Sequence, residues 1–299
     1  MPTSSRRTFI QKSAFTLGAL SLAPTSLFSK SRVKTVGIQL FTFMGIIDQD
    51  TTGTLKRIAS LGYVDIESAF SMKGGFYGFK PKEFNSIIND LGLKWRSHHV
   101  LGTPFVPPPD MKLPFDPSSI KSLKMNMQEL IDDAAEGGIP YLTCANIAIG
   151  NSDEIKSSIE ILNKTAEGCK KAGLTLVYHN HDAEFKKVDE VIPYDQFLSL
   201  LSKNIKFELD LAWATKGGAD PVKLFSDNPG RFPLWHMKDL DKSYETILPL
   251  GEGTIDFKRI FENAKKSGMK YCFVEHDFPK DAFASITTSM NYLKSAILK

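Results

Sequence analysis

The chain of 299 residues is poor in cysteine and shows no strong bias in its composition. Its three cysteines, Cys144, Cys169 and Cys272, are odd in number and lack C-x-x-C spacing, so neither a disulfide framework nor a thiolate zinc site is indicated. Hydrophobic residues make up 42% of the chain, and nothing in the composition suggests a disordered, collagenous or coiled-coil protein. The sequence is that of a globular protein with a large core.

A basic surplus is also lacking once the first thirty residues are set aside. These hold four basic residues and no acidic one, which leaves 33 basic against 34 acidic residues in the remainder. Because nucleic-acid binding needs a basic face, we expect no nucleic-acid partner. A dinucleotide-binding sheet is not indicated either, since no G-x-G-x-x-G follows the first predicted strand, residues 35–41.

Residues 1–30 resemble a bacterial twin-arginine export signal. Arg6 and Arg7 precede an apolar stretch, residues 14–23, that is too short for an ordinary transmembrane helix. An amphipathic helix of the fold is the weaker interpretation because the segment has no acidic residue, and no clean A-x-A cleavage site is present. We expect an exported protein, periplasmic or otherwise extracytoplasmic, with no stable membrane span after signal removal and one mature domain, residues 31–299.

Apolar strands alternate with helices along that domain. The predicted strands are residues 35–41, 63–67, 94–99, 141–145, 175–179, 205–210, 234–237 and 271–275. The predicted helices are residues 50–60, 81–91, 118–135, 152–172, 193–201, 221–226, 256–266 and 281–298, with Ser152 as the expected N-cap of the fourth. Eight such units over roughly 260 residues predict an α/β fold, a single (β/α)8 TIM barrel.

Two irregular segments, residues 71–79 and 101–117, follow the second and third predicted strands. In a barrel both would lie on the face that carries active sites. They are rich in proline, glycine and aromatic residues, so they are either lids over a site or packed surface loops.

Four later strands end in residues of the types that commonly bind metal ions in proteins. These are His179, Asp210, His236 and Glu275. Because the carboxyl ends of barrel strands converge on one mouth, the four side chains are expected to lie together. A mixed set of imidazoles and carboxylates suits Mn²⁺, Co²⁺, Zn²⁺ or Fe²⁺, so we expect one divalent metal ion.

The order of the motifs VGIQLFTF, LGYVDIE, LKWRSHHV, LVYHNHDAEF, FELDLAWA, HMKD, GEGTIDF and FVEHD resembles that of the sugar phosphate isomerase/epimerase family, whose fold is a xylose isomerase-like TIM barrel. The resemblance covers essentially all of the chain after the leader. It implies a metal-dependent isomerase or epimerase that acts on a small carbohydrate through an enediolate next to a carbonyl. That family holds one ion with Glu, Asp, His and Glu, so Asp210, His236 and Glu275 match, whereas His179 replaces the first glutamate.

The replacement at His179 bears on the mechanism, because an imidazole bound to a metal cannot also act as a free base. Glu275 would then be one acid/base group, with His181 or Glu208 as the second. Lys238 is a candidate donor to an oxyanion, or else an ordinary ion-pair partner of the adjacent aspartate, Asp239. The candidates for substrate binding are Glu67, His99, Trp213 and Phe41.

Other functions stay open on the same scaffold. One is a dehydratase or lyase of a keto sugar or inosose, and another is a non-catalytic exported sugar-binding protein. An apurinic endonuclease is less favoured because Trp213 stands where that family carries a histidine. The segment Gly251, Glu252 and Gly253 is interpreted as a turn, since an acidic residue between the glycines suits a phosphate poorly.

Overall fold

The structure is a computed structural model that describes residues 35–106 and 120–298. The predicted export signal, residues 1–30, lies outside the described residues. Residues 107–117, most of the second irregular segment, lie outside them as well. Among the residues that are described, no helix has both the length and the hydrophobicity that a membrane crossing requires.

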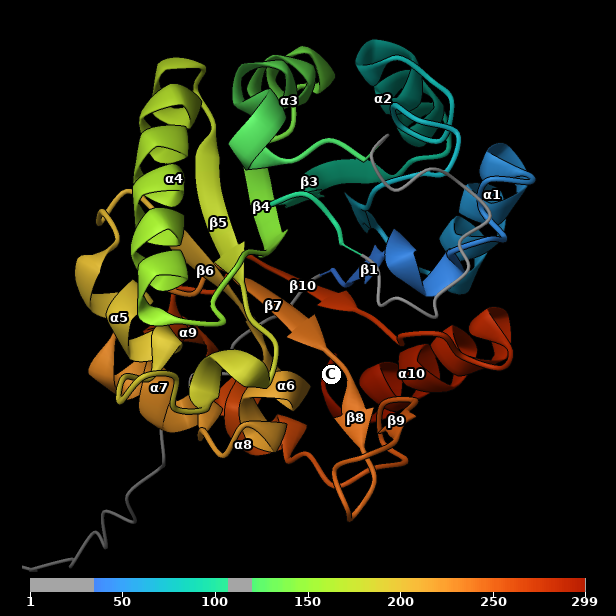
Figure 1. The fold of residues 1–299 in the computed structure, drawn as a ribbon. Helices are drawn as coiled ribbons and strands as arrows, with labels where there is room; N and C mark the ends of the chain where they lie inside the picture. Colours follow the sequence, from blue (N-terminus) through green and yellow to red (C-terminus); the bar gives the residue numbers. More distant parts are fainter. Residues whose placement is uncertain (1–34, 107–119, 299) are drawn as a thin grey trace, which may run out of the picture. The chain divides into compact units, whose positions relative to one another are not determined.

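Eight parallel strands close into a barrel with the helices around it (Figure 1), which confirms the predicted (β/α)8 architecture. The order around the barrel is β1-β10-β7-β6-β5-β4-β3-β2. The strands are β1 (Gly37–Gln39), β2 (Asp65–Ser68), β3 (Lys94–Leu101), β4 (Tyr141–Asn146), β5 (Thr175–His179), β6 (Lys206–Asp210), β7 (Leu234–Met237) and β10 (Tyr271–Val274).

The helices begin and end largely where capping residues predict. Ten α-helices lie within the described residues: α1 (Thr51–Leu61), α2 (Pro81–Asp90), α3 (Leu123–Gly137), α4 (Ser152–Lys171), α5 (Pro193–Leu200), α6 (Leu211–Lys216), α7 (Pro221–Asp227), α8 (Phe257–Glu262), α9 (Ala264–Ser267) and α10 (Ala282–Ala296). The expected cap of α4 was wrong by one residue: the side chain of Asn151, not Ser152, accepts the backbone N–H of Glu154.

Several short elements differ from the prediction. The first strand ends early, and a 3-10 helix, η1 (Leu40–Phe43), continues from it. The predicted helix at residues 256–266 is divided into α8 and α9 at Asn263. Helix α6 and a small hairpin of β8 (Asp239–Leu240) and β9 (Ile247–Leu248) were not predicted.

An apolar layer closes one end of the barrel interior. Val177, Leu234 and Phe273 are fully buried there and pack with Tyr141 and Tyr271. Along β7, His236 follows Leu234 on the same face, because successive side chains of a strand point to opposite sides. The polar residues therefore begin directly above the apolar layer, toward the carboxyl ends of the strands.

The first irregular segment, residues 71–79, is a packed loop rather than a lid. Phe76 and Tyr77 are buried, and the ring of Phe76 lies 4.7 Å from that of Trp95. The hydroxyl of Tyr77 accepts the backbone N–H of Ala69 at 3.0 Å. Packing of this extent holds the loop against β3 and α2.

Candidate functional site

A cavity of about 1040 Å³ opens at the carboxyl ends of the strands. Seven of the residues predicted for the site line it: Phe41, His99, His179, His181, Trp213, Lys238 and Glu275. The other four, Glu67, Glu208, Asp210 and His236, are fully buried. The structure thus brings the predicted residues together in two levels, one on the cavity wall and one behind it.

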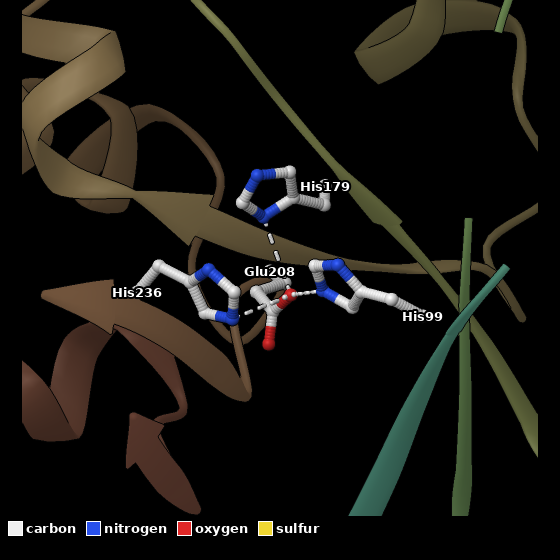
Figure 2. Close-up of side chains that lie close together, drawn as sticks. All are labelled: His99, His179, Glu208 and His236. Atoms are coloured by element: carbon white, nitrogen blue, oxygen red, sulfur yellow. Dashed lines mark hydrogen bonds and ion pairs between the residues drawn. The ribbon is translucent and has the colours of Figure 1, made fainter. Parts of the chain in front are cut away.

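Glu208 is the centre of the buried level. Its Oε2 atom lies 2.7 Å from Nε2 of His99, 3.3 Å from Nδ1 of His179 and 3.2 Å from Nε2 of His236. Figure 2 shows the three rings converging on this one carboxylate. The convergence follows from the strand register, which places His179 of β5 opposite Glu208 of β6.

His236 joins the two levels, because both of its ring nitrogens meet carboxylates. Nδ1 lies 2.7 Å from Oε2 of Glu275, and Nε2 contacts Glu67 as well as Glu208. Glu67 is held from β1 by the side-chain amide of Gln39, which donates to Oε2 at 2.8 Å. Each carboxylate of this network has a partner, as buried charges require.

The network determines the charge of its members. Burial favours the neutral ring of His99, but Glu67 and Glu208 outweigh it and raise the pKa to about 9. Burial likewise opposes the charge on His236, yet Glu208, Glu275 and Glu67 raise its pKa well above the ordinary value. Burial and the charges of His236 and His99 hold the pKa of His179 well below its ordinary value. His179 is therefore neutral, the form in which histidine binds metals.

Lys238 occupies the centre of the upper level. Its ammonium group lies 3.1 Å from Oδ2 of Asp210, 2.8 Å from Oε2 of Glu275 and 2.9 Å from Oδ2 of Asp277. Burial disfavours the ammonium, but these carboxylates raise the pKa of Lys238 well above the ordinary value. Burial opposes ionisation of Glu275 as well, and Lys238 and His236 reverse this, so its pKa lies well below the ordinary value.

The adjacent aspartate, Asp239, has a different role from the ion pair that the sequence left open. Its Oδ2 atom accepts the backbone N–H groups of Gly251 at 2.9 Å and Gly253 at 3.1 Å, and Oδ1 accepts that of Ile255 at 3.1 Å. The segment at residues 251–253 is thus a turn held by a buried carboxylate, as predicted.

Two groups of donor atoms could hold a metal ion among the described residues. One comprises His99, His179, Glu208 and His236, and the other Asp210, His236 and Glu275, with the atoms of each group within 4.8 Å of one another. The four predicted ligands are therefore divided between two groups that share His236. Their assignment stays a prediction.

The donor set fits a divalent ion of the predicted kind. Nδ1 of His179, Oε1 of Glu208 and Oδ2 of Asp210 are buried and make no hydrogen bond, although Asp210 faces Lys238 as an ion pair. Neutral imidazole and carboxylate oxygens together are ligands of Zn²⁺, Mn²⁺, Co²⁺ and Fe²⁺. Each of these three atoms would gain a partner if it bound a metal ion.

His181 and Trp213 lie on the cavity wall beside this centre. The ring of His181 is 5.0 Å from that of His179 and 6.2 Å from that of Trp213. Trp213 is in place because Asp210 caps α6, accepting the backbone N–H of Trp213 at 2.8 Å. One side chain of β6 thereby both faces Lys238 and fixes the helix that carries a wall residue.

Sequence reasoning missed three residues of the site. Asp277 lines the cavity, and burial together with Glu275 raises its pKa to about 6 despite the opposing charge of Lys238. Glu184 is buried, accepts the backbone N–H of His181 at 3.1 Å and lies 3.9 Å from its Nδ1. Gln39 was passed over as part of an apolar strand. The polar end of FVEHD was the available signal for Asp277.

Solved structures of similar proteins share this fold. A sugar phosphate isomerase/epimerase from Parabacteroides distasonis ATCC 8503 is 28% identical with a TM-score of 0.72, covering 89% of this chain and 95% of that one. A second from the same organism is 26% identical with a TM-score of 0.74, covering 89% and 99%. An L-ribulose 3-epimerase, at 18% identity and a TM-score of 0.66, covers 88% and 94% and shows the fold alone.

Sequence comparison points the same way. An inosose dehydratase from Geobacillus kaustophilus (strain HTA426) is 31% identical over 136 residues, which is 40% of this chain and 43% of that protein, so the match spans less than half of its length. The family model of the xylose isomerase-like TIM barrel matches residues 55–296. The chain therefore belongs to the xylose isomerase-like TIM barrel family.

Proposed function

We propose that this protein is a metal-dependent enzyme that moves a proton at a carbon atom next to the carbonyl group of a sugar. The observation that carries the proposal is the buried network of His179, Asp210, His236, Glu275 and Lys238, of which His179, Lys238 and Glu275 line one cavity. Relatives named as sugar phosphate isomerases/epimerases and as an inosose dehydratase support the same chemistry.

His179, Asp210, His236 and Glu275 are the ligands that we propose for the ion. A catalytic metal keeps one coordination position open to its substrate, and this requires ligands at the cavity surface. Two of the four, His179 and Glu275, line the cavity, whereas Asp210 and His236 lie behind them at the buried level, as Glu208 does. The buried group around Glu208 then supports the ligands from behind, because it contacts His179 and His236.

When bound, the ion would polarise the carbonyl and a neighbouring hydroxyl of the sugar. This would acidify the proton on the carbon atom that bears the hydroxyl, next to the carbonyl. Glu275 accepts that proton, since its low pKa keeps the carboxylate ionised. Lys238 donates a hydrogen bond to the oxygen on which charge develops. His181 is the better placed of the two candidates for the second acid/base group, because it lines the cavity and Glu208 is buried.

Removal of this proton from the carbon forms an enediolate, and the next step of the enediolate determines which product is formed. Return of the proton to the other carbon gives isomerisation, return to the opposite face gives epimerisation, and loss of a β-hydroxyl gives dehydration. We propose isomerase or epimerase activity, with a dehydratase as the second candidate because the inosose dehydratase is similar over 136 residues.

Hydrogen exchange tests the proposal directly. The metal-loaded protein is incubated in D₂O with keto sugars and inososes, and deuterium at the carbon next to the carbonyl is followed by NMR. We expect exchange with at least one compound, and exchange slower by about 10²–10⁴-fold with Glu275→Gln. A protein that binds sugars but exchanges no proton in the whole panel would be a non-catalytic binding protein.

Metal analysis tests the ligand set. Asp210→Ala should lose the ion that the wild-type protein retains, whereas Asp132→Ala, a change on the exposed side of α3, should keep it. Equal metal content in the Asp210 variant and the wild type would remove Asp210 from the set.

We also propose that the mature protein works outside the cytoplasm, on the basis of Arg6 and Arg7 before the short apolar stretch. Replacement of both arginines by lysine should retain the protein in the cytoplasmic fraction of a bacterial host. Undiminished export of that variant would show that the pair is not the signal.

A further inference from the structure

Polar side chains at the carboxyl ends of the strands form one part of the cavity wall, here called the polar floor, and this bears on the kind of sugar that enters it. His99, His179, Lys238 and Glu275 all reach the cavity from strand ends or their immediate neighbours. On the proposed function, on which this inference rests, the sugar ring that reacts must lie against these groups. These four groups can serve the hydroxyls of one sugar ring, because each buried hydroxyl needs a hydrogen-bond partner.

The mouth of the same cavity is aromatic. The ring of Phe41 lies 5.3 Å from that of Phe278, edge to face at 74°, and 6.0 Å from that of Phe70. All three line the cavity. They come from η1, from the segment after β2 and from the segment after β10, so three separate parts of the chain supply one aromatic surface.

Phe278 is unusual both in the exposure of its ring and in the conformation of its backbone. Its side chain is 76% exposed, although an aromatic ring gains by leaving water. Its φ of 50° lies in the left-handed region, which a bulky L residue rarely adopts. Strained backbone of this kind gathers at ligand sites, so the ring of Phe278 has the features of a ligand contact.

The size of the cavity agrees with a ligand larger than one sugar. Its volume of about 1040 Å³ lies just above the roughly 300–1,000 Å³ that is usual for drug-sized ligands. A monosaccharide on the floor would leave the surface of Phe41, Phe70 and Phe278 uncovered. Aromatic rings pair well with other flat apolar rings, and the carbon rings of phenylalanine carry no lone-pair acceptor or polar donor for a sugar hydroxyl.

We infer that the substrate is a glycoside whose sugar ring carries a ketone away from the anomeric carbon, with this ring on the polar floor and a flat, apolar aglycone against Phe41, Phe70 and Phe278. The three phenylalanines select the aglycone, and the floor selects the sugar. The sugar and the aglycone are thus recognised by different parts of the chain, which allows the two contributions to be measured separately.

Matched pairs of ligands test this inference. Methyl and phenyl glycosides of glucose, galactose and xylose are titrated into the metal-loaded protein, and their dissociation constants are measured by calorimetry. We expect the phenyl glycoside to bind about tenfold more tightly than the methyl glycoside of the same sugar, in keeping with one aromatic contact that buries apolar area. Phe278→Gly, which keeps the left-handed backbone accessible, should bring that ratio close to one, whereas Leu200→Ala, an exposed apolar residue of α5, should not change it.

Three outcomes with the glycoside pairs would overturn the inference, and a fourth concerns a disaccharide. The three are equal affinities for phenyl and methyl glycosides, a phenyl preference that survives in both Phe278→Gly and Phe41→Ala, and no binding of any phenyl glycoside. Tighter binding of cellobiose than of phenyl glucoside would also overturn it, in favour of an oligosaccharide. Because binding is measured without turnover, the proposed function fails separately, through absence of exchange in D₂O.

Discussion

Nε2 of His99 lies 2.7 Å from Oε2 of Glu208, although β4 and β5 stand between their strands in the barrel. The contact therefore crosses the interior rather than following the sheet. It is joined there by His179 and His236, which reach the same carboxylate from β5 and β7. One carboxylate thus orients three imidazoles, two of which are proposed metal ligands.

Glu208→Gln is expected to weaken metal binding without unfolding the protein. The amide keeps the size of the side chain but removes the charge that holds the rings of His179 and His236. Loss of a group that orients metal ligands typically costs about 10–100-fold in affinity. The measurement is metal titration of the apo-protein, with Glu262→Gln on the exposed surface of α8 as the control. An unchanged affinity would show that the ligands are oriented by other contacts.

Glu275→Gln is expected to lose activity even when it is fully loaded with metal. An amide oxygen can still coordinate the ion, but it cannot accept a proton. A general base contributes about 10²–10⁴-fold, so the rate of hydrogen exchange in D₂O should fall by that order. Metal content is measured on the same sample, so that loss of the ion is not mistaken for loss of the base. Near-native exchange would transfer the role to His181 or Asp277.

Metal affinity is expected to rise with pH. In the metal-free protein the pKa of His236 is raised well above its ordinary value by Glu208, Glu275 and Glu67, against the effect of burial, and that of His99 is raised to about 9. Both rings hold a proton at neutral pH, and the ion must displace at least the proton of His236. Affinity should therefore increase about tenfold per pH unit for each proton released, and fall as the solution is acidified.

Calorimetry in buffers with different ionisation enthalpies counts the protons released. At pH 7.5 we expect at least one for each ion bound, and fewer in His99→Gln if that ring also loses its proton. Binding that is independent of pH between about 6 and 9 would contradict the assignment of His236 as a ligand.

The positions of the strand ends could be predicted from the sequence, because an apolar run that stops at His179 or Asp210 must place that residue at the mouth of a parallel barrel. Their depth could not. Glu208 and Asp210 lie two residues apart on one face of β6, and only the register shows that His179 pairs with Glu208 while Asp210 pairs with His236. The two donor groups are thus separated by the two-residue step from Glu208 to Asp210 along β6.

Short elements escaped prediction for a different reason. Helix α6 has six residues, and β8 and β9 have two each, so none carries enough periodicity to be recognised. Their positions depend on tertiary contacts, such as the capping of α6 by Asp210 and the bonds from Asp239 to residues 251–255. The sequence contains these aspartates, but it does not show which backbone N–H groups they accept.

Asp239→Ala is expected to destabilise the protein through this last contact. The carboxylate is 1% exposed and accepts backbone N–H groups of Leu240, Gly251, Gly253 and Ile255 at 2.9–3.1 Å. Its removal leaves the buried N–H of Leu240 and three partly buried N–H groups without this acceptor, and loss of an acceptor costs about 1–3 kcal/mol for a single buried group and more where that acceptor is charged. We expect the free energy of unfolding to fall by about 2–4 kcal/mol.

Urea unfolding of the apo-protein measures this change without a contribution from bound metal. Asp239→Asn keeps one oxygen acceptor and should fall between the wild type and the alanine variant. Asp241→Ala is the matched control, since Asp241 accepts similar bonds from Ser243 and Glu245 on the exposed surface. A decrease of less than about 0.5 kcal/mol in the free energy of unfolding of Asp239→Ala would lie within the range usual for surface substitutions. It would show that water replaces the carboxylate and that the turn is stable without it.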